Sequence, residues 1–398
     1  MHIPITKPFL DAKEKDFIYQ ALESGWIVQG PFVKKFEDSF ANFVGSKRAI
    51  ATSNCTTALH LALEASGIMR GDKVIVPAFT FVASANSVEY TGAEVVFCDI
   101  DLKTFNIDMQ HLVRIIEGDR QKKIKAIMPV NLFGLCADLP QIMEIAKQYN
   151  LKVIEDSACG LGGSISHKHS GTFGDFGCFS FHPRKSITTG EGGMLVTNHL
   201  EDAEKIVSMR DHGSSKSDLA RHFEKGGSLL PEYNILGHNY RMNDLQGAMG
   251  VAQMEKLDPI LNARRKLASN YNRALSECHF LTLPHVPQNY IHGYQSYVCL
   301  FSPLENLSMA NMEKIESLNI KRNQFMRILE DFGIATRQGT HAVHNLGYYK
   351  KRYKTEKNDF MNSYIADRLS IALPLYTSMT SHEFNYVIEH IKQAFQKL

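Results

Sequence analysis

The chain has 398 residues, of which 44% are hydrophobic and 22% are charged, so it can bury a large core and form two lobes. Its formal net charge of +2 gives no reason to expect nucleic acid or a membrane surface as a partner. The N-terminus has no signal-peptide pattern, and no apolar run approaches the roughly 20 residues of a membrane helix. The seven scattered cysteines indicate neither a disulfide framework nor a zinc site, and no metal is expected. We therefore expect a cytoplasmic protein.

Short apolar segments alternate with helical patterns through the first two thirds of the chain. Strands are expected at residues 49–52, 73–79, 93–100, 124–131, 151–157, 178–181 and 193–197. These runs are apolar on both faces, which is typical of a largely parallel sheet covered by helices on both sides. An amphipathic helix is expected within residues 138–150, with Asp138 as its N-cap.

The pattern changes near residue 252. A long charged helical segment covers residues 253–277, strands follow near 294–301, and two further helical stretches come after them. We therefore expect a large α/β domain over residues 1–251 and a smaller α+β domain over residues 252–398.

The first candidate site follows the strand at 49–52, where small polar residues lead into a helix. Free N–H groups at Thr56 and Thr57, together with the helix dipole, favour an anion site there. An ordinary helix cap has the same pattern, so this segment alone leaves both interpretations open.

Two acids, Glu155 and Asp156, end the strand at 151–157. An acid in this place is either a cap or buried structural group, or it is the partner of a pyridinium nitrogen. A buried aspartate keeps such a nitrogen protonated, which turns the pyridine ring into an electron sink for a developing carbanion.

Lys185 lies in "SFHPRKSITTGEGGMLVT", residues 180–197, between a short strand and a glycine-rich turn. The glycines at 190, 192 and 193 permit positive φ angles and close backbone approach. The end of a strand is where open α/β sheets bind ligands, although a surface lysine in a β-turn is the alternative. A lysine, an aspartate and an anion site together point to pyridoxal phosphate.

These segments belong to an ordered set of motifs that spans nearly the whole chain. The set includes "TTALHLAL", "VIVPAFTFVASANSV", "PVNLFGLCADL", "VIEDSACGLGG", "GDFGCFSFHPRK", "TTGEGGMLVTN", "LGHNYRMNDLQGAMG" and "SIALPLYTSMTSHE". In this order and spacing the chain resembles the DegT-type sugar aminotransferases. The resemblance implies an α/β fold of fold type I, with a large mixed, mostly parallel sheet domain and a smaller α+β domain.

The resemblance also assigns roles to residues around the cofactor, pyridoxal 5'-phosphate. It implies that Lys185 binds the cofactor covalently and then moves a proton, and that Asp156 pairs with the pyridinium nitrogen. It further implies that Ser180, with Thr56 and Thr57, holds the phosphate.

Two more roles follow from the resemblance. Phe81 is expected to lie over the cofactor ring, with a core phenylalanine as the alternative. Asn239 is expected to reach the phosphate of the neighbouring subunit in a homodimer with shared active sites, with a turn asparagine of unusual backbone angles as the alternative.

The chain departs from the family pattern at three positions. Cys159 stands where relatives usually carry Gln or His against the cofactor, and the resemblance places it among the cofactor-binding residues. Cys55 replaces a glycine before the phosphate helix, so the turn there must tolerate a side chain. Asn131 takes a place often held by His.

The implied reaction moves an amino group from L-glutamate to a keto group, at C4 in preference to C3, of a nucleotide-linked deoxy sugar for polysaccharide or other glycan synthesis. One alternative is a sugar 3-dehydratase of the same family, which has histidine in place of Lys185. Another is a non-catalytic regulatory protein, which would have lost this lysine or Asp156.

Residues 210–227 and 337–353 are rich in His, Lys, Arg and Tyr, and we expect them to cover a UDP, dTDP or GDP sugar.

Overall fold

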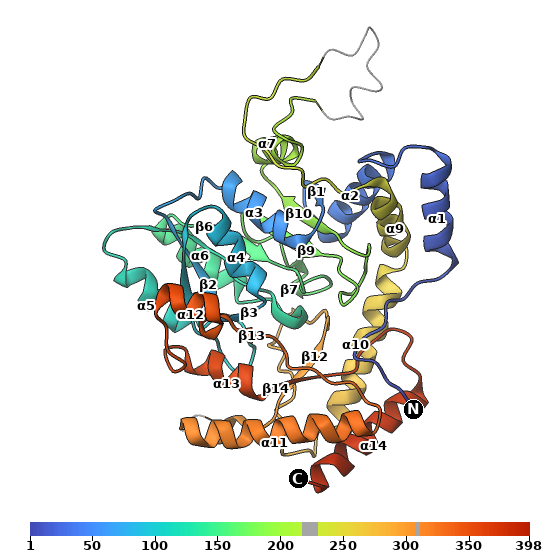
Figure 1. The fold of residues 1–398 in the computed structure, drawn as a ribbon, viewed down its shortest axis with the longest axis vertical. Coiled ribbons are helices and arrows are strands. Elements are labelled where there is room, and N and C mark those ends of the chain that lie inside the picture. Colours follow the sequence, from blue (N-terminus) through green and yellow to red (C-terminus); the bar gives the residue numbers. More distant parts are fainter. Residues whose placement is uncertain (217–229, 308–310) are drawn as a thin grey trace.

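The computed structural model describes residues 1–216, 230–307 and 311–398, and a seven-stranded sheet lies at its centre (Figure 1). The strand order is β1-β10-β9-β6-β5-β2-β4. The strands are β1 (Arg48–Thr52), β2 (Lys73–Pro77), β4 (Glu94–Cys98), β5 (Ile124–Ile127), β6 (Lys152–Asp156), β9 (Phe176–Ser180) and β10 (Gly193–Thr197). Within this sheet β10 alone runs against the others, because it pairs antiparallel with β1 and β9 while the other pairs are parallel. The expected mixed, mostly parallel sheet is confirmed.

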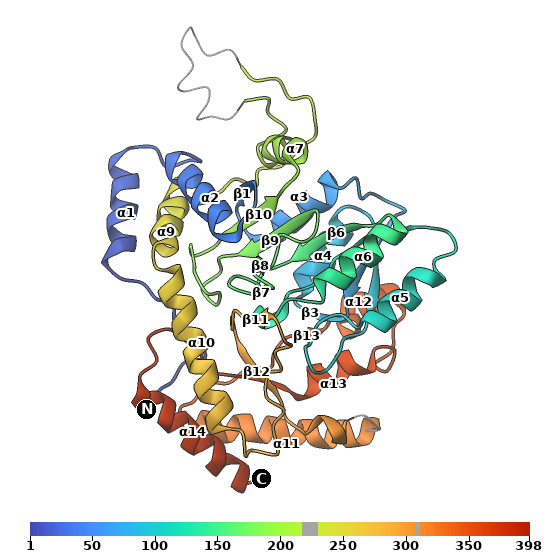
Figure 2. The same ribbon diagram turned by 180° about the vertical axis from the view of Figure 1, so that it is seen from behind.

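Helices cover both faces of this sheet. On one face α3 (Cys55–Ala65), α4 (Val82–Tyr90) and α7 (Leu200–Arg210) share a core with Val74 and Val76 of β2 (Figure 1). On the other face α5 (Met109–Gly118) and α6 (Leu139–Tyr149) pack against Ile75 of the same strand (Figure 2). The alternation along β2 therefore explains why the strand is apolar throughout.

The expected N-cap of α6 is confirmed, since the Asp138 carboxylate accepts a hydrogen bond from the backbone N–H of Gln141 at 3.3 Å. The remaining helices are α1 (Ala12–Glu23), α2 (Pro31–Val44), α9 (Asp244–Met254), α10 (Leu257–Ala274), α11 (Met312–Asp331), α12 (Gly347–Tyr353), α13 (Met361–Leu369) and α14 (Ser381–Gln396). None of the helices in the described part of the chain is long and apolar enough to cross a membrane.

A second group of elements lies below the large sheet in Figure 1, next to both chain termini. The strands outside the large sheet, in both parts of the chain, are β3 (Phe79–Thr80), β7 (Ser164–Ile165), β8 (Lys168–His169), β11 (Tyr290–Ile291), β12 (Tyr297–Leu300), β13 (His341–Ala342) and β14 (Ser370–Leu373). β12 pairs with β14, and α11 and α14 pack with this pair in a separate core. Ile3 joins this core from the other end of the chain. The division at residue 252 remains a prediction, since β11 pairs with β7 and β13 with β3 across it.

Two expectations about the C-terminal helices are wrong. The segment 253–277 is not one helix: α9 ends at Met254 and α10 begins at Leu257, because Pro259 has no N–H to donate to the carbonyl of Glu255. In the described part of the chain, four helices and not two follow β12. The short α12 and α13 have too few turns to show a helical period in the sequence.

The direction of the strands fixes where a site can form. β1, β6 and β9 run the same way, so their carboxyl ends meet at one edge of the sheet. Thr56 and Thr57 follow β1, Asp156 ends β6 and Ser180 ends β9. The topology therefore brings these residues together.

Candidate active site

A cavity of about 900 Å³ opens at this edge, between the large sheet and the lobe that carries β14. The residues expected at the cofactor site line it together, with one exception, Asn239. The lining includes Thr56, Thr57, Phe81, Asp156, Cys159, Ser180 and Lys185.

Asp156 supplies a buried carboxylate to this cavity. Its residue is only 4% exposed, its Oδ2 accepts a hydrogen bond from the Ser84 hydroxyl at 2.6 Å, and its Oδ1 accepts one from the N–H of Ala158 at 3.1 Å. Burial raises the pKa of Asp156, while these two hydrogen bonds and the nearby charge of Lys185 act to lower it. The carboxylate therefore sits where a further cationic partner would stabilise its ionised form.

The neighbouring acid, Glu155, has a different role. Its carboxylate accepts hydrogen bonds from the N–H groups of Phe173 and Gly174 at 2.7 and 2.9 Å and from Nδ2 of Asn131 at 2.9 Å. Alternation along β6 turns Glu155 away from the side occupied by Asp156. Glu155 is the structural acid of the pair, and Asn131 is one of its supports.

Lys185 reaches the same cavity from the turn after β9. Its Nζ donates a hydrogen bond to Sγ of Cys159 at 3.1 Å, and its backbone N–H donates to the carbonyl of His182 at 2.8 Å. That backbone bond closes a turn, but the half-buried lysine lines the cavity and does not stand free on the surface. Cys159 thus lies beside the amine, at the position where the family usually has Gln or His.

The N-terminus of α3 differs in one detail from the expectation. The N–H of Thr57 is not free, because it donates to Oδ1 of Asn54 at 3.0 Å, and Asn54 is the N-cap of the helix. An asparagine three positions before Thr57 is a signal that could have predicted this bond. Thr56 and Thr57 nevertheless line the cavity in the first turn of α3.

Cys55 is compatible with this turn because it is the first residue of α3 and does not have a positive φ. The close approach is made by Gly193 of β10, where an added Cβ would lie 2.4 Å from the carbonyl carbon of Asn54. Gly190 supplies the positive φ, at 82°, in the turn before that strand.

Comparison with known proteins agrees with this arrangement. The profile of the DegT/DnrJ/EryC1/StrS aminotransferase family matches residues 8–392. The chain belongs to this family. The resemblance to the DegT-type sugar aminotransferases is therefore confirmed. The expected architecture and the dependence on pyridoxal phosphate are confirmed with it.

Three relatives of this DegT-family chain illustrate the match. GDP-perosamine synthase from Caulobacter vibrioides is 37% identical over 393 residues, which cover 98% of each protein. Spore coat polysaccharide biosynthesis protein SpsC from Bacillus subtilis is 34% identical over 391 residues, which cover 98% of this chain and 96% of SpsC. Spr1654 from Streptococcus pneumoniae, solved in its PMP form, superimposes with a TM-score of 0.88 at 25% identity over 100% of both chains.

The charged and polar groups that line the cavity of this DegT-family chain fit pyridoxal phosphate. Asp156 offers a buried anion for a ring nitrogen, Lys185 offers an amine, and the first turn of α3 offers a positive dipole end for a phosphate. Ser180 adds a hydroxyl at the end of β9. Phe81 is 62% exposed at the cavity, so the alternative of a core phenylalanine is wrong.

Asn239 does not line the cavity of its own chain. It is exposed, and its backbone bridges to Asp211. Its φ is not positive, so the alternative of a turn asparagine chosen for unusual backbone angles is wrong.

The segments expected to cover a nucleotide sugar are partly described. Residues 217–227 of the first lie outside the described residues. Within the second, Arg337 and His341 line the cavity, whereas Tyr349 of α12 is buried in the core. Arg184, which sequence reasoning did not single out, also lines the cavity.

Ser84 is the other residue that sequence reasoning missed, because its partner Asp156 lies 72 positions further along the chain. A hydrogen bond to a charged group contributes about 1.5–3 kcal/mol. We expect Ser84→Ala to lower kcat by roughly tenfold or more and to change the pH titration of the bound cofactor's absorbance, since Asp156 loses a donor to its ionised form.

Ser87→Ala is the matched control. Ser87 lies on the same helix and is equally buried, but its hydroxyl donates only to the carbonyl of Ser84 at 2.9 Å. Equal effects of both substitutions on kcat and on the absorbance titration would contradict a role for Ser84 in positioning Asp156.

Proposed function

We propose that this aminotransferase moves an amino group from L-glutamate to the C4 keto group of a nucleotide-linked deoxy sugar, for polysaccharide or other glycan synthesis. The observation that carries the proposal is that the Lys185 amine and the buried Asp156 carboxylate face one cavity at the N-terminus of α3. When bound there, pyridoxal phosphate supplies a ring that accepts electrons from the reacting carbon.

Lys185 would hold the cofactor covalently, and its free amine would take the proton from Cα of the amino donor and later return a proton. Asp156 holds the proton on the ring nitrogen, and Ser84 orients Asp156. Cys159 contacts the lysine amine, so its thiol lies next to the position where protons move.

Ser180, Thr56 and Thr57 hold the phosphate, together with the dipole of α3. Thr57 donates its N–H to Oδ1 of Asn54 at 3.0 Å and its hydroxyl to the carbonyl of Asn54 at 2.7 Å, so its hydroxyl must leave that carbonyl before it can donate to a phosphate. Phe81, the N-cap residue of α4, lines the cavity and would pack against the cofactor ring.

Arg184 and Arg337 are the cations of the cavity that suit a diphosphate, since guanidinium groups pair with phosphate oxygens. The GDP-perosamine synthase among the relatives supports a GDP-linked sugar as the substrate. A lysine at position 185 favours transamination over the 3-dehydratase alternative.

The function is tested by incubating the enzyme with L-glutamate and a panel of GDP-, UDP- and dTDP-linked 4-keto and 3-keto sugars. We expect the GDP-linked 4-keto sugar to give an amino sugar, identified by mass and NMR, together with 2-oxoglutarate. Lys185→Ala should abolish product, because the proton carrier is lost. The control Lys168→Ala, which changes an exposed lysine, should retain activity. Product from a 3-keto sugar alone would overturn the C4 assignment.

We further propose a homodimer in which Asn239 completes the phosphate site of the partner subunit. Its exposure and its absence from the cavity of its own chain support this arrangement, because a side chain with that role must point outward.

Mixing two inactive variants, Lys185→Ala and Asn239→Ala, tests the shared site. In a mixed dimer one site collects both defects and the other collects neither, so up to about half of the wild-type activity per mixed dimer should return. Asn234→Ala, an exposed asparagine of the same segment, is the control that should stay active. Failure to regain activity despite proven subunit exchange would show that Asn239 does not act across the interface.

A further inference from the structure

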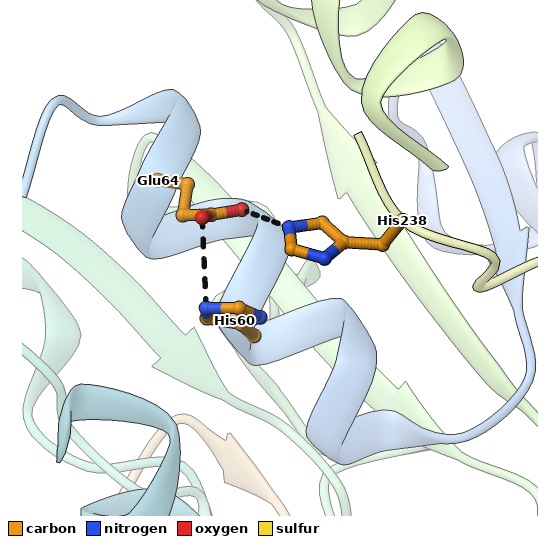
Figure 3. Close-up of side chains that lie close together, drawn as sticks. All are labelled: His60, Glu64 and His238. Atoms are coloured by element: carbon orange, nitrogen blue, oxygen red, sulfur yellow. Dashed lines mark hydrogen bonds and ion pairs between the residues drawn. The ribbon is translucent and has the colours of Figure 1, made fainter. Parts of the chain in front are cut away.

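Three side chains converge outside the active-site cavity, between α3 and the segment that leads to Asn239 (Figure 3). They are His60, Glu64 and His238, and one ligand atom of each lies within 4.8 Å of the others. Nε2 of His238 is 2.8 Å from Oε2 of Glu64, and Nε2 of His60 is 3.7 Å from Oε1 of the same carboxylate.

The backbone fixes all three positions. His60 and Glu64 are four residues apart on α3, which places them on one face of the helix. The N–H of His238 donates to the carbonyl of Met209 at 2.7 Å, and its ring stacks on Tyr240 with centroids 4.6 Å apart. These contacts hold the two histidine rings and Glu64 on neighbouring segments of the fold.

Nε2 of His60 is the atom of the cluster that lacks a hydrogen-bond partner among the described residues. His60 is 6% exposed, and its Nε2 is buried without a hydrogen-bond partner among the described residues. The distance of 3.7 Å to Glu64 is too long for a hydrogen bond. A buried polar atom without a partner is costly, so Nε2 of His60 is available to a water molecule or an ion.

The other ring nitrogen of His60 is already engaged, since Nδ1 lies 3.1 Å from the hydroxyl of Tyr240. A metal-binding histidine characteristically uses its second nitrogen in this way, which fixes the orientation of the ring. Nε2 of His60 is thus held toward Glu64 and His238.

We propose that His60, Glu64 and His238 bind one zinc ion through the two Nε2 atoms and the carboxylate, with water as the fourth ligand. Two imidazoles and one carboxylate form a donor set that suits zinc, whereas calcium and magnesium prefer oxygen ligands alone. Ligands at about 2.1 Å from a tetrahedral zinc lie about 3.4 Å from one another. The observed 2.8 and 3.7 Å lie on either side of that value.

The cluster is also open to solvent on one side, because the side chains of Glu64 and His238 are 24% and 22% exposed. An ion and its water ligand can therefore enter. Bound zinc would link α3, which begins at the phosphate motif, to the backbone just before Asn239. The proposal does not depend on the substrate or on the amino donor.

The test uses the tag-free holoenzyme after dialysis against a chelator, titrated with zinc chloride in competition with a chromophoric indicator. We expect one zinc per chain, a zinc-dependent rise in the thermal midpoint, and the visible absorption of tetrahedral cobalt when Co²⁺ replaces zinc. Glu64→Gln and His238→Asn should each weaken zinc binding by about tenfold or more and should remove the cobalt signal. His199→Asn, which changes a histidine that pairs with Asp175 elsewhere on the surface, should bind zinc as the wild type does.

Thermal midpoints measured without zinc show whether each variant is folded. If Glu64→Gln does not fold, zinc binding by His238→Asn tests the site. Absence of zinc binding by the wild type would overturn the proposal and leave the cluster as an ion pair between His238 and Glu64. Zinc binding that is unchanged in a folded His238→Asn variant would also overturn it, because the ion would then be bound elsewhere.

Discussion

The active site depends on one buried negative charge, the carboxylate of Asp156 at the end of β6. Taking a carboxylate out of water is costly unless a cation and hydrogen-bond donors replace the solvent. Ser84 and Ala158 supply two donors, and Lys185 supplies part of the positive charge. We propose that a protonated ring nitrogen of the bound cofactor supplies the remainder, so that the interaction that stabilises the carboxylate would also activate the cofactor.

The surrounding fold serves to hold this charge in place. Glu155, the next residue, ties β6 to the loop before β9 through buried hydrogen bonds to Phe173 and Gly174. This bonding keeps β6 beside β9, the strand whose end leads to Lys185. Two adjacent acids therefore have separate roles, one structural and one at the cofactor, because strand geometry points them to opposite sides.

Local sequence signals predicted the strands, the Asp138 cap and the positions of Lys185 and Asp156, because each depends on neighbours within a few residues. Contacts between distant segments could not be predicted. The bond from Ser84 to Asp156 joins residues 72 positions apart, and the contact of His238 with Glu64 joins residues 174 positions apart. The expectation that the chain has no zinc site was based on cysteine spacing alone. That spacing carries no information about two histidines and a glutamate that only the fold brings together.

The protonation state of the ring nitrogen tests the account most directly. It can be measured by ¹⁵N NMR on enzyme reconstituted with pyridoxal phosphate labelled at that nitrogen. We predict the chemical shift of a protonated nitrogen throughout the neutral pH range in the wild type, and that of an unprotonated nitrogen in Asp156→Ala. An unprotonated shift in the wild type, or the same protonated shift in both proteins, would contradict the role given to Asp156.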